Sequence, residues 1–526
     1  MEKESIQNNI HSKANLIWSI AEILTGHYKP HEYGDIIIPF TVLCRFDSVL
    51  EPTKRKVLEA YPELKDSPIM EEELYDITGH RFYNLSRNTF KSLLDDPDNI
   101  YQNMKNYING FSNNILEILR KLKVDTYIDM LYQKKILYSI IQEFTKKNSN
   151  FSPKYTSNIE MGYIFEEIIR RFSESHNEDA GQHYTPREVI QLMVELLSSL
   201  ELKSTNYYTI YDPACGTGGM LTVAKENLLK RFPTKEIICY GQELNDQTFA
   251  ICKADMLIKG ENEENIQNGN TLTEDYFIKD HFDYIISNPP FGREWKNEKK
   301  IVESELKDEN NRYLYGLPPV TDSQTLFLQI ALSKMKENGS RVAIIQNGSP
   351  LFSGDAGSGL SNIRCNILEK DLLEAIISLP KNIFYNTGIE TYIWILSNKK
   401  EEKRKGKVQL INASTFFEKQ TKPLGQKKNY LSKENIEQIK KIYIDFQENE
   451  YSKILSTIEF GYHQITIEYP KKDDYGINIL KNGKKIPDST LRDTERVPLK
   501  IDIQDYFKKE VAPYTKDTWI DFSKTK

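Results

Sequence analysis

Short apolar runs alternate with helical stretches through the middle of this chain, and two of the runs end in distinctive turns. One run ends at Asp212-Pro-Ala-Cys-Gly216-Thr217-Gly218-Gly219, and the other ends at Asn288-Pro289-Pro290-Phe291. Apolar runs alternating with helices predict an open, mostly parallel α/β sheet with helices on both faces. Ligands bind such sheets outside the carboxyl ends of the strands. We therefore expect both turns at the ligand-binding edge of one sheet, on neighbouring strands.

The expected strands are 207–211, 237–242, 283–287, 341–346, 373–379 and 391–396. The expected helices are 161–172, 188–198, 219–231, 246–259, 323–337 and 362–369. Two long insertions, 292–322 and 348–361, follow strand ends. The first is polar and contains Arg293, Trp295, Lys296 and Tyr313. Loops of this length in a compact domain usually carry function or move.

The sequence predicts three domains: a helical domain at 1–150, an α/β catalytic domain at 151–400 and a mixed extension at 401–526 that docks on a partner. Apolar residues at three- and four-residue spacing predict the first domain. The polar segment 146–153 is the expected linker. A helix is expected at 433–448. Three large aromatic residues of the first domain are expected in its core and not on a base-stacking surface: Trp18, Phe40 and Phe46.

Composition excludes several classes of protein. The chain has 526 residues, of which 28% are charged. It has no apolar stretch near the roughly 20 residues of a membrane helix and no basic-then-apolar start, so we expect a cytoplasmic protein outside the membrane. Its five cysteines lack ligand-like spacing and His183 has no partner at metal spacing, so we expect reduced thiols and no metal site. Ser349 and Ser353 lack a nucleophile elbow, which argues against a hydrolase.

The net charge of −6 bears on nucleic-acid binding. A protein that binds DNA alone usually shows a basic footprint, because neutralising phosphates supplies much of the affinity. This chain lacks such a footprint as a whole. If its substrate is DNA, we expect a partner to hold the DNA and read the sequence.

The first turn has the residues of a nucleoside site. Gly216, Gly218 and Gly219 let a backbone approach a ligand closely, and their spacing is not that of dinucleotide enzymes. Asp212, at the strand end, can bind an ammonium group such as that of a methionine moiety. Glu243 ends the next strand, where an acid usually holds ribose hydroxyls. By itself, the turn is more often an ordinary strand–helix junction, with Glu243 a solvated acid at the strand end.

The second turn is suited to a planar amine. The lone pair of such an amine is delocalised, so activation needs acceptors that bind its hydrogens as it attacks. The Asn288 side-chain oxygen and the Pro289 carbonyl can supply them, and two prolines stiffen the turn. Phe291 offers a ring on which a base can stack. Together with the first turn, this pattern predicts an enzyme that methylates an amino group on a planar base.

A third turn, which precedes the first strand, can close over a cofactor tail. It consists of Gln182, His183, Tyr184, Thr185, Pro186 and Arg187. Pro186 is typical of a first helical turn. By itself, this segment predicts only the start of a helix.

The three turns, in this order, resemble those of S-adenosylmethionine-dependent N6-adenine DNA methyltransferases of the γ arrangement. More closely, nearly the whole chain resembles the modification (M) subunit of type I restriction–modification systems. The segments that resemble blocks of that family are residues 16–34, 384–389, 460–462, 496–499 and 510–513.

The resemblance implies a Rossmann-like, seven-stranded, mostly parallel sheet with one reversed strand within 391–396 and an all-α N-terminal domain. It implies that S-adenosyl-L-methionine is surrounded by the third turn, Asp212, residues 216–219, Glu243 and Asn270. Residues 288–291 then grip an adenine that is flipped out of duplex DNA. Relatives place two M subunits on one specificity (S) subunit, optionally with a restriction (R) subunit.

Other functions stay open from the residues alone. The turn chemistry also suits the N4 amine of cytosine or the amide of a glutamine. A third alternative is a catalytically silent scaffold that keeps the fold for assembly only. The target sequence is not expected to be encoded in this chain.

Overall fold

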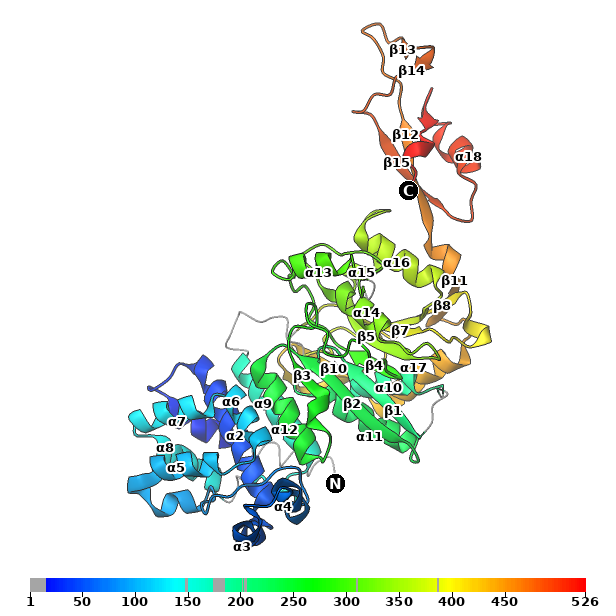
Figure 1. Cartoon of the computed structure of the whole chain (residues 1–526). Helices are drawn as coiled ribbons and strands as arrows, with labels where there is room; N and C mark the ends of the chain where they lie inside the picture. The colour runs from blue at the N-terminus through cyan, green and yellow to red at the C-terminus, as the bar shows by residue number, and fades with distance from the viewer. Residues whose placement is uncertain are drawn as a thin grey trace. The chain divides into compact units, whose positions relative to one another are not determined.

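The computed structural model describes residues 16–146, 150–173, 185–200, 202, 206–308, 311–385 and 387–526. The chain divides into two units (Figure 1). The first unit comprises Met1–Arg187 and Asn206–Ile278, and the second comprises Glu188–Thr205 and Lys279–Lys526. Within the described ranges, no helix combines the length and the apolar character needed to cross a bilayer.

The N-terminal part of the first unit is helical, as expected. Residues 16–24 form a helix. The elements that follow are η1 (Pro30–Glu32), α2 (Tyr33–Leu50), α3 (Lys54–Leu64), α4 (Met70–Thr78), η2 (Ser92–Asp95), η3 (Pro97–Asn99), α5 (Ile100–Asn109), α6 (Asn113–Lys121), α7 (Val124–Gln133), α8 (Leu137–Thr145) and α9 (Asn158–Ser173).

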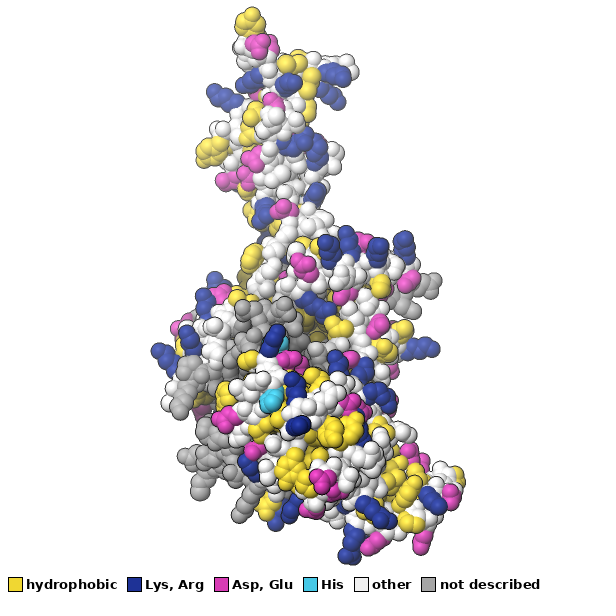
Figure 2. Space-filling model, turned by 90° about the vertical axis from the view of Figure 1, so that its left-hand side faces the viewer, with side chains coloured by type: hydrophobic (Ala, Val, Ile, Leu, Met, Phe, Trp, Pro, Cys, Tyr) yellow, Lys and Arg dark blue, Asp and Glu magenta, His cyan; other side chains and the backbone are white. Residues whose placement is uncertain are grey.

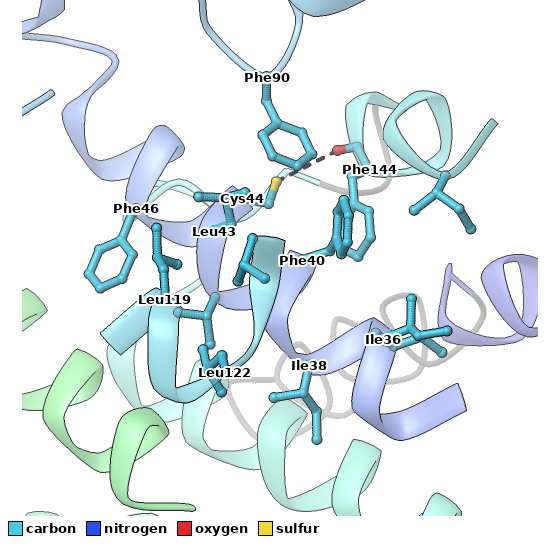
Figure 3. Packing of buried hydrophobic residues seen from close by; sticks show 14 of the residues in the cluster. Ile36, Ile38, Phe40, Leu43, Cys44, Phe46, Phe90, Leu119, Leu122 and Phe144 are labelled. Carbon is cyan, nitrogen blue, oxygen red and sulfur yellow. Dashed lines mark hydrogen bonds between the residues drawn. The ribbon is translucent and has the colours of Figure 1, made fainter. Parts of the chain in front are cut away.

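Helix α2 is the centre of this helical part, because it is apolar on almost every side. Phe40 and Phe46 are fully buried, as expected. The Phe40 ring stacks on Phe144 with centroids 6.2 Å apart, and the Cys44 thiol donates to the Phe144 carbonyl at 3.8 Å (Figure 3). Trp18 was expected in this core and is not: its side chain is 55% exposed, because it lies on the outward side of the helix formed by residues 16–24.

One hydrophobic cluster joins this helical part to the α/β elements of the same unit. It runs from Leu16 through the N-terminal helices and α9 to Leu257 of α12 (Asp246–Ile258). The Arg45 guanidinium, 1% exposed, donates to the carbonyls of Phe151 and Thr156. Buried residues on both sides of residue 150 thus pack in one cluster, and the described part of the expected linker is hydrogen-bonded to α2.

The first unit also contains three parallel strands with their helices. They are β1 (Tyr207–Asp212), α11 (Gly219–Arg231), β2 (Glu236–Glu243), α12, η5 (Glu263–Asn265) and β3 (Ile266–Asn268). β1 pairs with β2 from Tyr207↔Glu236 to Asp212↔Gly241, and β2 pairs with β3. β3 was not expected, because three residues are too short for an alternating pattern to be seen in the sequence.

Six further strands of the α/β sheet lie in the second unit. They are β4 (Tyr284–Ser287), β5 (Arg341–Asn347), β6 (Leu373–Ser378), β7 (Thr391–Ser397), β8 (Lys407–Asn412) and β11 (Ser452–Ser456), in the order β11-β8-β6-β7-β5-β4. β7 is antiparallel to both β5 and β6, which confirms the expected reversed strand. With the three strands of the first unit, the described residues have nine such strands, two more than the seven expected.

The two additional strands come from the expected C-terminal extension. β8 runs parallel to β6 and β11 runs antiparallel to β8, so the expected boundary near residue 400 falls inside the sheet. Helix α17 (Lys433–Asp445) is tied to α10 (Arg187–Leu197) by the Lys440–Glu195 ion pair at 2.8 Å. β8 and β11 were missed because each is short and has polar residues among the apolar ones.

The remaining elements of the second unit include a small C-terminal sheet. The elements before it are α13 (Lys299–Glu305), α14 (Gln324–Ser333), α15 (Ser349–Phe352), α16 (Gly359–Glu369), η6 (Glu402–Arg404), β9 (Glu418–Leu424), β10 (Lys427–Tyr430) and η7 (Thr457–Phe460). The C-terminal elements are β12 (Tyr462–Glu468), β13 (Leu480–Lys481), β14 (Lys484–Lys485), β15 (Asp493–Pro498), α18 (Ile503–Tyr506), η8 (Phe507–Val511), β16 (Trp519–Ile520) and η9 (Phe522–Lys524). β15, β12 and β16 form a three-stranded sheet with its own apolar cluster, drawn in orange and red in Figure 1.

Candidate active site

The glycine turn after β1 is held by its own backbone and by the end of β2. The Cys215 N–H donates to the Gln242 carbonyl at 3.0 Å, and the Gly218 N–H donates to the Cys215 carbonyl at 2.8 Å. Gly216 and Gly218 have φ of 55° and 80°, which glycine adopts without the strain of a side chain. Thr217 is half-buried between them, and Gly219 begins α11.

The two glycines of positive φ differ in what surrounds them. A Cβ added to Gly218 would lie 2.6 Å from the Cys252 sulfur, so this glycine is required by packing. A Cβ added to Gly216 would meet nothing within 4 Å. The space at Gly216 is therefore open to a ligand, while the backbone beneath it is rigidly supported.

Two acids flank this turn. Asp212 ends β1, is fully buried, and accepts the Ala214 N–H on Oδ1 at 3.0 Å. Glu243 ends β2; its Oε2 accepts the Gly216 N–H at 2.9 Å and its Oε1 accepts the Asn245 N–H at 2.8 Å. Because β1 and β2 are parallel neighbours, both carboxylates lie at the same edge of the sheet, which is where the sequence predicted them.

The loop after β3 is tied to the same turn. Thr271 is buried, and its hydroxyl donates to the Pro213 carbonyl at 2.6 Å. Its neighbour Asn270 is half-buried and accepts the Leu272 N–H on Oδ1 at 3.1 Å. The structure thus brings Asn270 together with the glycine turn. Thr271, which makes the connection, was not singled out from the sequence.

Only half of the third turn can be placed, because Gln182, His183 and Tyr184 lie outside the described residues. The Thr185 hydroxyl lies 3.5 Å from the Met220 sulfur, in the first turn of α11. The Arg187 guanidinium lies over the Tyr163 ring at 3.7 Å from its centroid. Pro186 is buried immediately before α10 begins. The described end of this segment therefore contacts the first turn of the helix that follows the glycine turn.

The Asn-Pro-Pro-Phe turn belongs to the second unit, where it follows β4. Asn288 and Phe291 are each 8% exposed, Pro289 is buried and Pro290 is half-buried. The turn ends at Gly292, whose φ of 66° lets the chain leave the strand sharply. The side chains at both ends of this turn are therefore largely shielded from solvent.

The insertion 292–322 was expected to be a polar functional or mobile loop, and its two largest aromatic residues are instead buried. Trp295 is 1% exposed and Tyr313 is fully buried. The Trp295 N–H donates to the Val320 carbonyl at 2.9 Å, and its indole N–H donates to the Pro319 carbonyl at 2.9 Å. The described residues of the insertion thus close into a folded loop whose two ends lie side by side.

Asp322 fastens these two ends beside the Asn-Pro-Pro-Phe turn. Its carboxylate accepts the Gln324 N–H at 3.1 Å, the Gln324 side-chain amide at 2.7 Å and the Gly292 N–H. Burial raises the pKa of Asp322 in spite of these donors. The Gln324 side-chain oxygen accepts the Asn347 N–H at 2.9 Å, which links the hydrogen bonds of Asp322 to the end of β5.

Sequence reasoning missed Asp322 and Gln324. The available signal was an Asp-Ser-Gln sequence at the start of a helix, where acids commonly cap N–H groups. Nothing in that local pattern indicated that the carboxylate also reaches Gly292.

Metal binding finds no support within the described ranges, where no group of three or more His, Cys, Asp or Glu side chains could hold an ion. The five cysteines are free.

Comparison with known proteins covers most of the chain. The N-6 DNA Methylase family profile matches residues 157–485, and the HsdM N-terminal domain profile matches residues 13–144. The type I restriction enzyme MjaIX methylase subunit of Methanocaldococcus jannaschii is 26% identical over 515 residues, covering 94% of this chain and 86% of that protein. The type I restriction enzyme HindI methylase subunit of Haemophilus influenzae is 30% identical over 274 residues, covering 51% of this chain and 58% of that protein.

Solved structures agree on the fold. A type I restriction–modification system methyltransferase subunit from Streptococcus thermophilus superposes with a TM-score of 0.67 at 23% identity. The match covers 86% of this chain and 96% of that one.

Proposed function

Because this chain belongs to the N-6 DNA Methylase family, we propose that it transfers a methyl group from S-adenosylmethionine to the N6 amine of adenine in duplex DNA. The observation that carries the proposal is the pairing of two sites on one chain. The first unit has an open, acid-flanked glycine turn, and the second has a stiff Asn-Pro-Pro-Phe turn braced by Asp322.

The first unit fits the cofactor. The open space above Gly216 admits an adenosyl group close to the backbone. Glu243 is fixed by two N–H donors at a strand end where its oxygens can accept ribose hydroxyls. Asp212 is a carboxylate suited to the methionine ammonium, and the N-terminal N–H groups of α11 suit its carboxylate. S-adenosylmethionine, when bound there, supplies the methyl group on a sulfonium.

In the second unit, Asn288 and Pro289 hold the amine. Their carbonyl oxygens accept its two hydrogens and favour the geometry in which the nitrogen lone pair points at the incoming methyl. The adenine must first be turned out of the helix, since its N6 is engaged in base pairing. Phe291 then stacks on the ring, and the proline pair prevents the acceptors from relaxing away.

Asn288→Ala tests this assignment. We expect methylation of duplex DNA to be lost while calorimetry shows S-adenosylmethionine binding close to wild type, because Asn288 belongs to the substrate turn. Asn297→Ala, at an exposed asparagine of the neighbouring insertion, is the matched control and should keep full activity. Full activity of Asn288→Ala would refute the role of this residue.

Two alternative acceptors share the same turn chemistry: cytosine N4 and a glutamine amide. Mass spectrometry of nucleosides from treated DNA separates them, because only the proposed function yields N6-methyladenine. N4-methylcytosine in its place would replace the adenine assignment. Absence of S-adenosylmethionine binding would instead favour a silent assembly scaffold.

We further propose that the chain works as an M subunit, two copies on one S subunit, with an R subunit joining in some assemblies. The names of its relatives and its net charge of −6 support this reading. The isolated chain should bind duplex DNA weakly and without sequence preference, and addition of S should produce methylation at defined positions. Sequence-specific methylation by the purified chain alone would overturn the subunit assignment.

A further inference from the structure

A small β-hairpin that connects β12 to β15 carries an unusual concentration of lysines. Residues 470–487 fold back on themselves: the Lys471 N–H donates to the Ile486 carbonyl at 2.8 Å, and the Ile479 N–H donates to the Lys471 carbonyl at 2.8 Å. β13 and β14 form the hairpin itself, and Pro470 bridges to Pro487. We call residues 470–487 the lysine tip; it lies beyond the β12–β15 pair in Figure 1.

The lysine tip is positive although the chain is negative. Its local charge is +3, in a chain of net charge −6. This charge is the sum of five lysines (Lys471, Lys472, Lys481, Lys484 and Lys485) and two aspartates (Asp473 and Asp474). Figure 2 shows dark blue side chains at this end of the molecule.

The acids near the lysine tip offset only part of its charge. Asp473 accepts the N–H groups of Tyr475 at 3.0 Å and Ile477 at 2.9 Å and keeps its charge. Outside the tip, Asp488 interacts electrostatically with Lys471, and Asp517 with Lys472. Lys485 pairs with Asp517 at 2.9 Å. The other four lysines are exposed.

The hairpin turn sets two of these lysines directly opposite each other. Asn482 and Gly483 have φ of 52° and 75°, the turn geometry that an Asn-Gly pair favours between two strands. Lys481 and Lys484 are therefore partners across the ladder. Like charges in that position destabilise a β-pair. This arrangement works against the stability of the hairpin, and an anion lying over it would reduce that cost.

We propose that the lysine tip binds the phosphate backbone of the substrate duplex at a distance from the target base, without reading its sequence. The inference rests on the proposed function, which makes duplex DNA the substrate. A two-stranded ribbon with exposed lysines matches the charge of DNA, and the Tyr475 side chain, 91% exposed, adds a hydroxyl donor for a phosphate oxygen. Ile477 and Leu480 are also exposed and would suit a protein partner, but the net charge favours the polyanion.

The test is the double variant Lys481→Ala/Lys484→Ala, which leaves the Asn-Gly turn in place. Binding of the full chain to a fluorescent duplex of arbitrary sequence is measured by anisotropy over a series of salt concentrations. Each phosphate contact contributes about 0.9 to the slope of log affinity against log salt, so two lost contacts should reduce the slope by about 2. The affinity at low salt should fall roughly tenfold or more.

The matched control is Lys403→Ala/Lys405→Ala. It removes the same charge from two lysines that already pair with Glu401 and Glu402, so the slope should stay at the wild-type value. Lys481→Arg/Lys484→Arg keeps both charges and should also keep the slope. Circular dichroism of all variants should match the wild type.

Two results would overturn the inference. One is a slope unchanged in Lys481→Ala/Lys484→Ala; if that variant also loses binding to a specificity subunit, the lysine tip belongs to a protein partner. The other is an equal fall in the Lys403→Ala/Lys405→Ala control. Failure of the proposed function itself would appear separately, as absence of N6-methyladenine with the wild-type chain.

Discussion

The rigidity of the glycine turn can be tested by adding one methyl group at each of its two positive-φ glycines. In Gly218→Ala the methyl is forced to 2.6 Å from the Cys252 sulfur at a φ of 80°. The left-handed backbone costs about 1–2 kcal/mol, and overpacking a close-packed site costs about 1–3 kcal/mol. The expected destabilisation is therefore about 2–5 kcal/mol.

Gly216→Ala is the matched comparison. Its φ of 55° carries the same backbone cost of about 1–2 kcal/mol, but its methyl meets no atom within 4 Å. This methyl instead occupies the open space above the turn, so the main expected loss is in S-adenosylmethionine affinity. Urea unfolding followed by circular dichroism measures the stability of each variant, and calorimetry measures cofactor binding.

A double-mutant cycle isolates the contact with Cys252. Gly218→Ala, Cys252→Ala and the double variant are compared, and the double variant should recover about 1–3 kcal/mol relative to the sum of the single changes. Equal destabilisation of Gly216→Ala and Gly218→Ala, or a cycle with no coupling, would refute the packing explanation. Unchanged cofactor affinity in Gly216→Ala would show that the open space is not the cofactor site.

Three other predictions follow from buried polar groups. Glu374→Ala should destabilise the second unit by about 3–5 kcal/mol in urea unfolding, because the buried Arg341 guanidinium then lacks the carboxylate that lies 2.8 Å away. Arg341→Met/Glu374→Leu removes both charges and should cost far less. Asp322→Ala should lower kcat for methyl transfer about tenfold or more without weakening cofactor binding, because it releases the N–H of Gly292. Asp322→Asn keeps one acceptor oxygen and should lower kcat less. Equal kcat in the wild type and both variants would contradict a role for the hydrogen bonds of Asp322. Burial lowers the pKa of Lys54 to about 8, so the folded protein loses that proton at a lower pH than the unfolded chain does. The free energy of unfolding should therefore rise between about pH 8 and pH 10.5, the ordinary pKa of lysine. The difference in urea midpoint between the wild type and Lys54→Met should change over this pH range, and a constant difference would contradict the lowered pKa.

The sequence by itself determined the features that depend on neighbouring residues: single helices, strand ends and turns. Helix α11 spans Gly219–Arg231, the range that the glycine turn and the apolar spacing predict. The strand ends at Asp212, Glu243 and Ser287 were recognisable because a strand's apolar run and its polar exit are adjacent in the chain. The chemistry of both turns is local in the same sense, since glycine and proline set their backbone wherever they occur.

What only the tertiary structure decided depends on partners far apart in the chain. Asp322 reaches Gly292 across thirty residues, and Trp295 becomes buried only when the far end of the same insertion returns to cover it. β8 becomes a sheet strand because β6 offers it an edge, and β11 then pairs with β8; their own polar sequences gave little sign of either pairing. Burial and hydrogen bonding between distant segments depend on how the whole chain closes, whereas periodicity and turn chemistry are properties of neighbouring residues.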